Sequence, residues 1–223
     1  MIVGILGGIA SGKSTVAGLF RAEGCRSVDA DAIGHEVLRE PAVKEGVRRL
    51  FGDDVFDDAG AVDRAALAKR VFGERDRDRV AQLNALTHPL IQDRVRAVVA
   101  RHRADLEEGR LTFPETVLIL DVSLLASSPL REQCDTLVFV EAPYAERRRR
   151  ARERGWSDDE LRRRESHQRS IDEKRRLASR RIDNSGELAA TRADVRAVLG
   201  ELERTSLQSA PSGDGGAGAP DEG

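Results

Sequence analysis

A glycine-rich segment near the start of the chain constrains the fold more than any other feature. Residues 7–15 read Gly-Gly-Ile-Ala-Ser-Gly-Lys-Ser-Thr, which fits the phosphate-loop pattern of two glycines separated by four residues and followed by Lys and Ser. Residues 1–6 form a short apolar run suited to a buried strand, and residues 14–23 have apolar positions at helical spacing. Strand, loop and helix therefore occur in the order that this motif requires.

The residue types in this loop predict a site for a nucleoside triphosphate. Glycines let successive backbone N–H groups point inward at phosphate oxygens. We expect Lys13 to reach the β- and γ-phosphates and the Ser14 hydroxyl to bind Mg²⁺. A glycine turn that only happens to precede Lys and Ser is the alternative, and the flanking strand and helix argue against it. The expected nucleotide-binding residues of the loop are Gly7, Gly8, Ile9, Ala10, Ser11, Gly12, Lys13, Ser14 and Thr15.

Composition narrows the class of protein. The 223 residues suit one domain with insertions, and 34% charged with 4% aromatic residues are typical of a helix-rich protein with a solvated surface. The net charge of −2 gives no overall attraction to nucleic acid or membrane. We find neither a secretory leader nor an apolar run that could span a bilayer, so we expect a cytoplasmic protein. Cys25 and Cys134 are the only cysteines and are expected to be core thiols.

The apolar pattern predicts a parallel sheet interrupted by helices. Four further strands are expected at residues 25–28, 117–121, 136–140 and 181–184. Between the second and third strands the spacing is almost entirely helical, which indicates an insertion rather than a run of strand–helix units. Breaks in these helices are predicted at Pro41, Gly52, Gly60, Gly73 and Pro89.

The phosphate loop alone does not define the reaction, because ATPases, GTPases and small-molecule kinases all use one. The carboxylates of Asp31 and Asp121 carry further information on the chemistry. The chain has no Asn followed by Lys, so a guanine-specific GTPase is not favoured. Asp31 follows the second strand, where it could accept the proton of an attacking hydroxyl, whereas Asp29 or Asp31 could instead cap the next helix. Asp121 ends the third strand, where it could help to hold Mg²⁺ or simply face solvent.

Arginine is concentrated at residues 147–154, which read Arg-Arg-Arg-Arg-Ala-Arg-Glu-Arg. Such a run is usually a solvated helix face. Arg150 and Arg154 are four residues apart and share one face, so we expect them on a helical lid that neutralises charge on the transferred phosphoryl group. Binding to nucleic acid is the competing interpretation, and the absence of interleaved aromatic residues argues against it.

Taken in order, these segments resemble the dephospho-CoA kinase family, from Met1 to about Leu199. After the phosphate loop, the segments that carry the resemblance are residues 28–33, 50–52, 60–67, 71–72, 83–84 and 88–91, then Gln168 and residues 182–186. The resemblance implies transfer of the γ-phosphate of ATP to the ribose 3′-hydroxyl of dephospho-CoA. ATP and dephospho-CoA would then be the partners and Mg²⁺ the cofactor, with no role for nucleic acid or membrane. The oligomeric state is left open.

The resemblance also implies roles for individual residues. Asp31 matches the family's proposed base, and Arg150 with Arg154 would lie in the lid. The remaining implied positions are Asn84, His88 and Leu124 for the acceptor, and Asn184 and Ser185 near the adenine of ATP.

Two departures from the family pattern keep alternatives open. Ala10 stands where Gly is common, which a small side chain tolerates if its backbone dihedrals are ordinary. Residues 122–127 read Val-Ser-Leu-Leu-Ala-Ser and lack the usual Pro and Glu, which affects the acceptor pocket. The alternatives are another small-molecule or nucleoside monophosphate kinase, or a regulatory nucleotide-binding module without phosphate transfer.

We therefore predict an α/β phosphate-loop NTPase with a three-layer parallel-sheet core, similar to nucleoside monophosphate kinases, with a helical insertion and a lid. The expected parts are a core of residues 1–30, 111–143 and 180–204, an acceptor-binding domain of residues 31–110, a lid of residues 144–179, and a disordered tail of residues 205–223.

Overall fold

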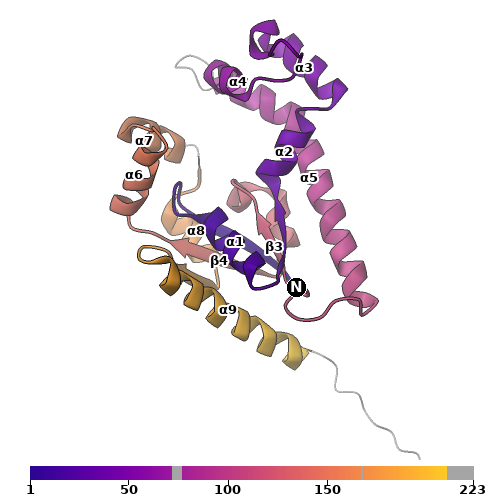
Figure 1. The fold of residues 1–223 in the computed structure, drawn as a ribbon, viewed down its shortest axis with the longest axis vertical. Helices are drawn as coiled ribbons and strands as arrows, with labels where there is room; N and C mark the ends of the chain where they lie inside the picture. The colour runs from indigo at the N-terminus through magenta and orange to yellow at the C-terminus, as the bar shows by residue number, and fades with distance from the viewer. Residues whose placement is uncertain (72–76, 167, 210–223) are drawn as a thin grey trace, which may run out of the picture.

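A computed structural model describes residues 1–71, 77–166 and 168–209, and its core is a five-stranded parallel sheet (Figure 1). The strands are β1 (Ile2–Gly7), β2 (Arg26–Asp29), β3 (Leu118–Asp121), β4 (Thr136–Glu141) and β5 (Arg180–Asp183). Their order is β2-β3-β1-β4-β5, and all neighbours are parallel. Each strand lies within one residue of its predicted bounds, because a fully buried parallel strand is a continuous apolar run.

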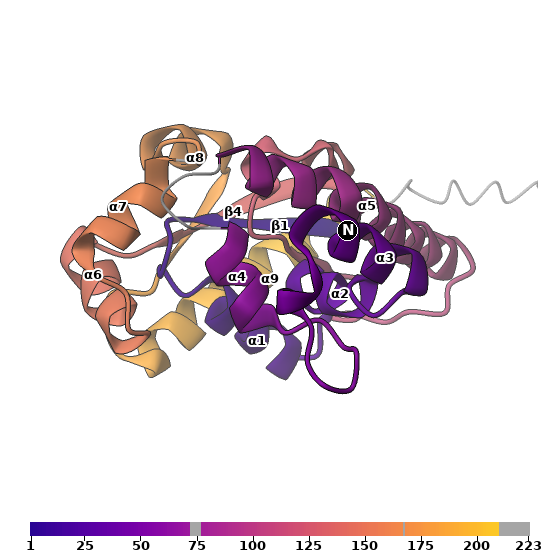
Figure 2. The ribbon, with the colours of Figure 1, turned by 90° about the horizontal axis from the view of Figure 1, so that it is seen from above.

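Helices cover both faces of this sheet, so the predicted three-layer architecture is confirmed. One face packs on α1 (Lys13–Ala22) and α9 (Leu188–Ser209), and the other packs on α5 (Arg77–Glu107) and α8 (Ile171–Leu177) (Figure 2). Side chains of β1 alternate between the two apolar cores. Short 3₁₀ helices η2 (Leu125–Ser127) and η3 (Pro129–Gln133) complete the second face.

The predicted helical insertion lies to one side of the sheet, at the top of Figure 1. Its elements are α2 (Ala30–Val37), α3 (Pro41–Phe51), the 3₁₀ helix η1 (Asp53–Val55) and α4 (Arg64–Val71), followed by α5. These elements share an apolar core of their own, which includes Val37, Val47 and Leu67. Three predicted breaks are confirmed: Pro41 starts α3, Gly52 ends it with a φ of 86°, and Gly60 lies in the turn before α4 with a φ of 69°.

The break predicted at Pro89 is wrong, because α5 continues through this residue. A proline inside a helix costs about 3 kcal/mol, since it lacks an N–H and crowds the preceding turn. Leu86 and Leu90 pack into the core of the insertion, whereas Val95 and Val99 pack onto the sheet. Burial on both sides of Pro89 offsets its cost and keeps one helix. The break predicted at Gly73 lies outside the described residues.

The arginine-rich segment folds as α6 (Tyr144–Glu153) and α7 (Asp158–Ser166), which lie together at one side of the sheet (Figure 1). The predicted interruption near Gly155 and Trp156 is confirmed. The predicted disordered tail of residues 205–223 is wrong for its first five residues, because α9 continues to Ser209. Residues 210–223 lie outside the described part of the chain. Among the described helices, none has the length and apolar character needed to cross a membrane.

Candidate functional site

The phosphate loop connects the carboxyl end of β1 to the start of α1. Gly12 caps α1 in the left-handed conformation, with a φ of 89°. A Cβ atom at this position would lie 2.1 Å from Nδ2 of Asn184. Gly12 is therefore required both by its backbone conformation and by the close approach of a neighbouring side chain.

Ala10 adopts a left-handed conformation with a φ of 58°, so the condition of ordinary dihedrals at this residue is not met. This conformation brings Cβ close to the following carbonyl oxygen and costs roughly 1–2 kcal/mol for an L-residue. The Ala10 side chain is buried beside Ala151 of α6 and Leu161 of α7. Apolar contact with α6 and α7 therefore compensates for a backbone conformation that usually favours glycine.

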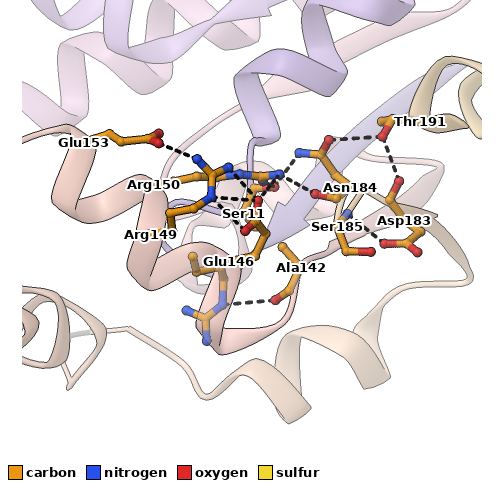
Figure 3. A network of polar contacts seen from close by, with 11 residues as sticks. Ser11, Ala142, Glu146, Arg149, Arg150, Glu153, Asp183, Asn184, Ser185 and Thr191 are labelled. Atoms are coloured by element: carbon orange, nitrogen blue, oxygen red, sulfur yellow. Dashed lines mark hydrogen bonds and ion pairs between the residues drawn. The ribbon is translucent and has the colours of Figure 1, made fainter. Parts of the chain in front are cut away.

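Side chains from distant parts of the chain donate hydrogen bonds to the Ser11 carbonyl of the loop (Figure 3). Arg150 donates from Nη1 to the Ser11 carbonyl oxygen at 3.1 Å and from Nη2 to the Asn184 carbonyl oxygen at 2.7 Å. The Asn184 amide donates to the same Ser11 oxygen at 2.7 Å and accepts a hydrogen bond from Thr191. Arg150 and Asn184 therefore hold the loop backbone.

Two buried cations contact the first half of the loop. Lys174 of α8 donates to the Gly7 carbonyl oxygen at 3.3 Å. Arg147 of α6 donates to the Ile9 carbonyl oxygen at 3.5 Å and forms an ion pair with Glu165 of α7. A carbonyl that accepts such a hydrogen bond has a fixed orientation. Because each peptide unit is planar, the N–H group of the same peptide is fixed as well.

Charged groups of both signs surround the Lys13 ammonium group of the loop. Burial lowers the pKa of the Lys13 ammonium, while the carboxylates of Asp121 and Asp31 raise it and the Arg154 and Arg147 charges lower it. Burial raises the pKa of the Asp121 carboxyl group, whereas a hydrogen bond from Ser14 and the Lys13 charge lower it. The structure therefore brings together Lys13, Asp31 and Asp121, which the sequence predicted from three separate segments.

Asp29, and not Asp31, caps helix α2. The Asp29 carboxylate accepts hydrogen bonds from the backbone N–H groups of Asp31 at 2.9 Å and Ala32 at 3.0 Å. The exposed Asp31 side chain instead accepts a hydrogen bond from the hydroxyl of Ser123, with oxygen–oxygen distances of 3.0 and 2.9 Å. The sequence left this choice open, and the structure frees Asp31 from the capping role.

The residues proposed to hold Mg²⁺ fit that ion. The Ser14 hydroxyl lies within hydrogen-bond reach of the half-buried Asp121 carboxylate. Mg²⁺ usually binds one or two protein oxygens together with substrate phosphates rather than a cage of protein ligands. Within residues 1–71, 77–166 and 168–209, no group of three or more His, Cys, Asp or Glu side chains is arranged to hold a metal.

A small pocket beside Lys13 is lined by residues from several elements, among them Ser123, Leu124, Gln168 and Lys174. Leu124 is 38% exposed. Asn84 and His88 lie one turn apart on α5, and burial lowers the pKa of His88. No hydrogen bond in the described part of the chain joins either residue to the loop. Ser185 donates its backbone N–H to Asp183 beside the Asn184 contacts.

The sequence interpretation missed the roles of Arg147, Lys174 and Ser123. Arg147 opens a run of four arginines, and Lys174 stands between Glu173 and Arg175, so both read as exposed charges on helices. Their burial depends on where α6 and α8 pack, which local spacing does not reveal. The sequence marks Ser123 only as part of a segment that departs from the family pattern.

Two solved structures share the fold of this chain. A crystal structure of shikimate kinase from Bacteroides thetaiotaomicron has a TM-score of 0.51 and 15% identity to this chain, and covers 91% of this chain and 98% of that one. A crystal structure of a Thermus thermophilus protein has a TM-score of 0.69 and 34% identity, and covers 91% and 97% of the two chains.

A family model for dephospho-CoA kinase matches residues 1–190. The curated dephospho-CoA kinase of Thermobifida fusca is 37% identical over 205 residues, which are 91% of this chain and 96% of that protein. The chain belongs to the dephospho-CoA kinase family.

Proposed function

We propose that this chain transfers the γ-phosphoryl group of ATP to the ribose 3′-hydroxyl of dephospho-CoA and forms CoA and ADP. This reaction is the last step of CoA synthesis. The observation that carries the proposal is the position of Asp31. Its carboxylate lies near enough to the Lys13 ammonium group of the phosphate loop to raise the pKa of that group. Family membership supports the choice of acceptor.

The phosphate loop binds and orients the triphosphate. Its inward N–H groups and the Lys13 ammonium stabilise negative charge on the β- and γ-phosphates. We propose that Gly7 to Thr15 make these contacts and that Asn184 and Ser185 lie near the adenine. Asn184 supports this by packing against Gly12, at the junction of loop and helix.

We propose that Asp31 accepts the proton of the attacking hydroxyl. The ribose 3′-oxygen forms a bond to the γ-phosphorus, the bond from that phosphorus to the β–γ bridging oxygen breaks, and ADP leaves. The hydroxyl proton passes to the Asp31 carboxylate. Ser123 holds this carboxylate by its hydrogen bond, which supports a fixed orientation toward the acceptor.

Mg²⁺ is proposed as the cofactor, held by Ser14 and Asp121 together with phosphate oxygens. When bound, it neutralises charge on the β- and γ-phosphates. The half-buried Asp121 carboxylate and its Ser14 neighbour are oxygen ligands of the kind that this ion prefers, which supports the assignment.

We propose two roles for the arginines of the lid, taken as residues 144–179. Arg150 holds the loop through the Ser11 carbonyl, whereas Arg154 lies near enough to Lys13 to lower its pKa. The Arg154 charge can therefore act on the transferred phosphoryl group. Closing the lid over both substrates would exclude water, which would otherwise hydrolyse ATP.

The acceptor is proposed to lie between the helices of residues 31–110 and the pocket beside Lys13. Leu124 borders that pocket, and Asn84 and His88 are one turn apart on α5, which runs beside α2. We also propose that the enzyme works in the cytoplasm, where a reducing environment keeps Cys25 and Cys134 as the free thiols seen here.

A competition assay tests this function against a different kinase activity. Dephospho-CoA, AMP, CMP and shikimate are offered separately and together, and ADP release is followed with ATP and Mg²⁺ in excess. We expect dephospho-CoA to give the largest kcat/KM. Preference for AMP or CMP would indicate a nucleoside monophosphate kinase, and ATP binding without turnover of any acceptor would indicate a regulatory module.

A further inference from the structure

Lys174 occupies a position that lysines rarely adopt. Its side chain lies on α8, and the residue is only 6% exposed. A lysine is almost never so deeply buried unless its ammonium group is paired. Nζ donates to the Gly7 carbonyl oxygen at 3.3 Å and to Oε1 of Gln168 at 2.6 Å, and both acceptors are neutral.

The surroundings of this ammonium group are mostly positive. Lys13 from α1 and Arg147 from α6 face it, and Glu165 from α7 is the carboxylate that acts on it. Glu165 is already engaged in the ion pair with Arg147. Burial and the Lys13 charge lower the pKa of Lys174 to about 8, although Glu165 raises it. Lys13, Gln168 and Lys174 also border the same small pocket.

A buried excess of positive charge is costly in an isolated protein and favourable beside a polyanion. Gly7 is the residue at which β1 passes into the phosphate loop. The Lys174 contact with its carbonyl therefore acts on the part of the loop that begins the nest of N–H groups. The Lys174 ammonium group therefore faces the phosphate site and not the apolar core, because it bonds the Gly7 carbonyl and lies near the Lys13 charge.

We infer that Lys174 is a positioning residue of the phosphate site, which fixes the Gly7 carbonyl and strengthens the binding of a triphosphate through its charge. The inference rests on the proposed use of ATP. Gln168 then orients the Lys174 ammonium group, because its side-chain oxygen accepts the hydrogen bond of 2.6 Å from Nζ.

Uptake of a proton when the triphosphate binds is expected if Lys174 has this role, and is not expected if the side chain only packs. The negative charge of a bound triphosphate favours the protonated form of a nearby amine and raises its pKa. At pH 8.5 the Lys174 amine is largely neutral before binding, since its pKa is about 8. Binding of the triphosphate at this pH should therefore draw a proton onto Lys174.

The test is titration calorimetry with a non-hydrolysable ATP analogue and Mg²⁺ at pH 8.5, in two buffers of different ionisation enthalpy. The difference in heat between the buffers gives the number of protons taken up. The variants are Lys174→Met, Lys174→Arg and, as a matched control, Lys69→Met, which removes an exposed lysine on α4. Far-UV circular dichroism checks that each variant is folded.

We expect Lys174→Met to bind the analogue at least about ten-fold more weakly and to take up fewer protons than wild type. Lys174→Arg should recover much of the affinity but not the uptake, because an arginine is always charged. Lys69→Met should match wild type in both quantities. If Lys174→Met does not fold, the Lys174→Arg result still decides the question, since uptake equal to wild type would contradict the inference.

Wild-type affinity and uptake in Lys174→Met would likewise overturn the role of this residue. The acceptor assay distinguishes such a failure from failure of the proposed function. A wild-type protein that binds the analogue but transfers no phosphate to dephospho-CoA would refute the proposed function and leave the calorimetric comparison of Lys174 variants intact.

Discussion

Ser123 donates its hydroxyl hydrogen to the Asp31 carboxylate, and its oxygen lies 3.0 and 2.9 Å from the two carboxylate oxygens. This contact joins the segment after β3 to the start of α2. We predict that Ser123→Ala lowers kcat about ten-fold and changes the KM for dephospho-CoA little, because a hydrogen bond to a charged group contributes about 1.5–3 kcal/mol. Ser123→Thr should retain most of the activity. Steady-state kinetics measure both parameters.

Ser206→Ala is the matched control for this prediction, since Ser206 is an exposed serine near the end of α9 and does not line the pocket beside Lys13. Its kcat should equal that of wild type. An unchanged kcat in Ser123→Ala would show that Asp31 does not depend on this hydrogen bond for its orientation.

Alanine substitutions of Arg150 and of its neighbour Arg149 should change kcat/KM for ATP by very different amounts. Arg150 bonds two backbone carbonyls of the site, whereas Arg149 is exposed and pairs with Glu146 and Glu153 of its own helix (Figure 3). We predict that Arg150→Ala lowers kcat/KM for ATP about 100-fold, because two charge-assisted hydrogen bonds are lost.

Arg149→Ala should stay within about two-fold of wild type in the same assay, since exposed ion pairs contribute only about 0–1 kcal/mol. Equal losses in the two variants would show that the arginines act through general charge and not through the contact with Ser11.

Gly12 and Gly18 offer a second matched pair, this time for stability. A methyl group at Gly12 would meet Asn184 at 2.1 Å on a backbone with positive φ, whereas nothing lies within 4 Å of a methyl group at Gly18 in α1. We predict that Gly12→Ala lowers the free energy of unfolding by at least about 1–3 kcal/mol. Gly18→Ala should raise it by up to about 1 kcal/mol, because alanine favours a helix.

Urea denaturation monitored by circular dichroism measures both free energies. A Gly12→Ala protein as stable as wild type, with normal ATP affinity, would contradict the tight packing of Asn184 against the loop.

The two cysteine thiols should resist modification in the folded protein. Burial raises the pKa of Cys25 and of Cys134 to about 12. The thiolate is the reactive form, so at pH 8 a disulfide reagent should label native protein at least about 100-fold more slowly than protein unfolded in urea. Similar rates in the two states would contradict the burial of these thiols.

These raised pKa values also fix the sign of a pH effect on stability. Between pH 9 and 12 the folded state keeps thiol protons that the unfolded chain has released. The thiols therefore contribute full stability below about pH 9, and this contribution is lost as the pH rises towards 12. Replacing both cysteines by alanine should make the unfolding free energy fall less steeply over this range.

Most of the sheet could be predicted from the sequence because buried parallel strands are continuous apolar runs, and the phosphate loop carries its own signature. The meeting of Lys13, Asp31 and Asp121 followed from the rule that ligands bind beyond the carboxyl ends of strands. Predictions from local sequence were wrong where contacts between distant segments determine the backbone conformation. The helix through Pro89 and the left-handed Ala10 both depend on apolar contacts with segments distant in the sequence.

Lys174 illustrates the same limit for the site. Its neighbours in sequence are charged, so the local pattern indicates a solvated helix, whereas the packing of α8 beside β1 buries the side chain. The Ser123 contact likewise joins residues 92 positions apart, which no spacing rule could connect.

The central claim is that Asp31 prepares the acceptor hydroxyl while the phosphate loop holds ATP. It is tested most directly by incubating wild type and Asp31→Asn with dephospho-CoA, ATP and Mg²⁺ and identifying the product by mass and phosphorus NMR. We predict that wild type forms CoA phosphorylated at the ribose 3′-position. Asp31→Asn should lose at least about 100-fold in kcat and keep its ATP affinity. A product phosphorylated elsewhere, or an Asp31→Asn enzyme with wild-type turnover, would contradict the account.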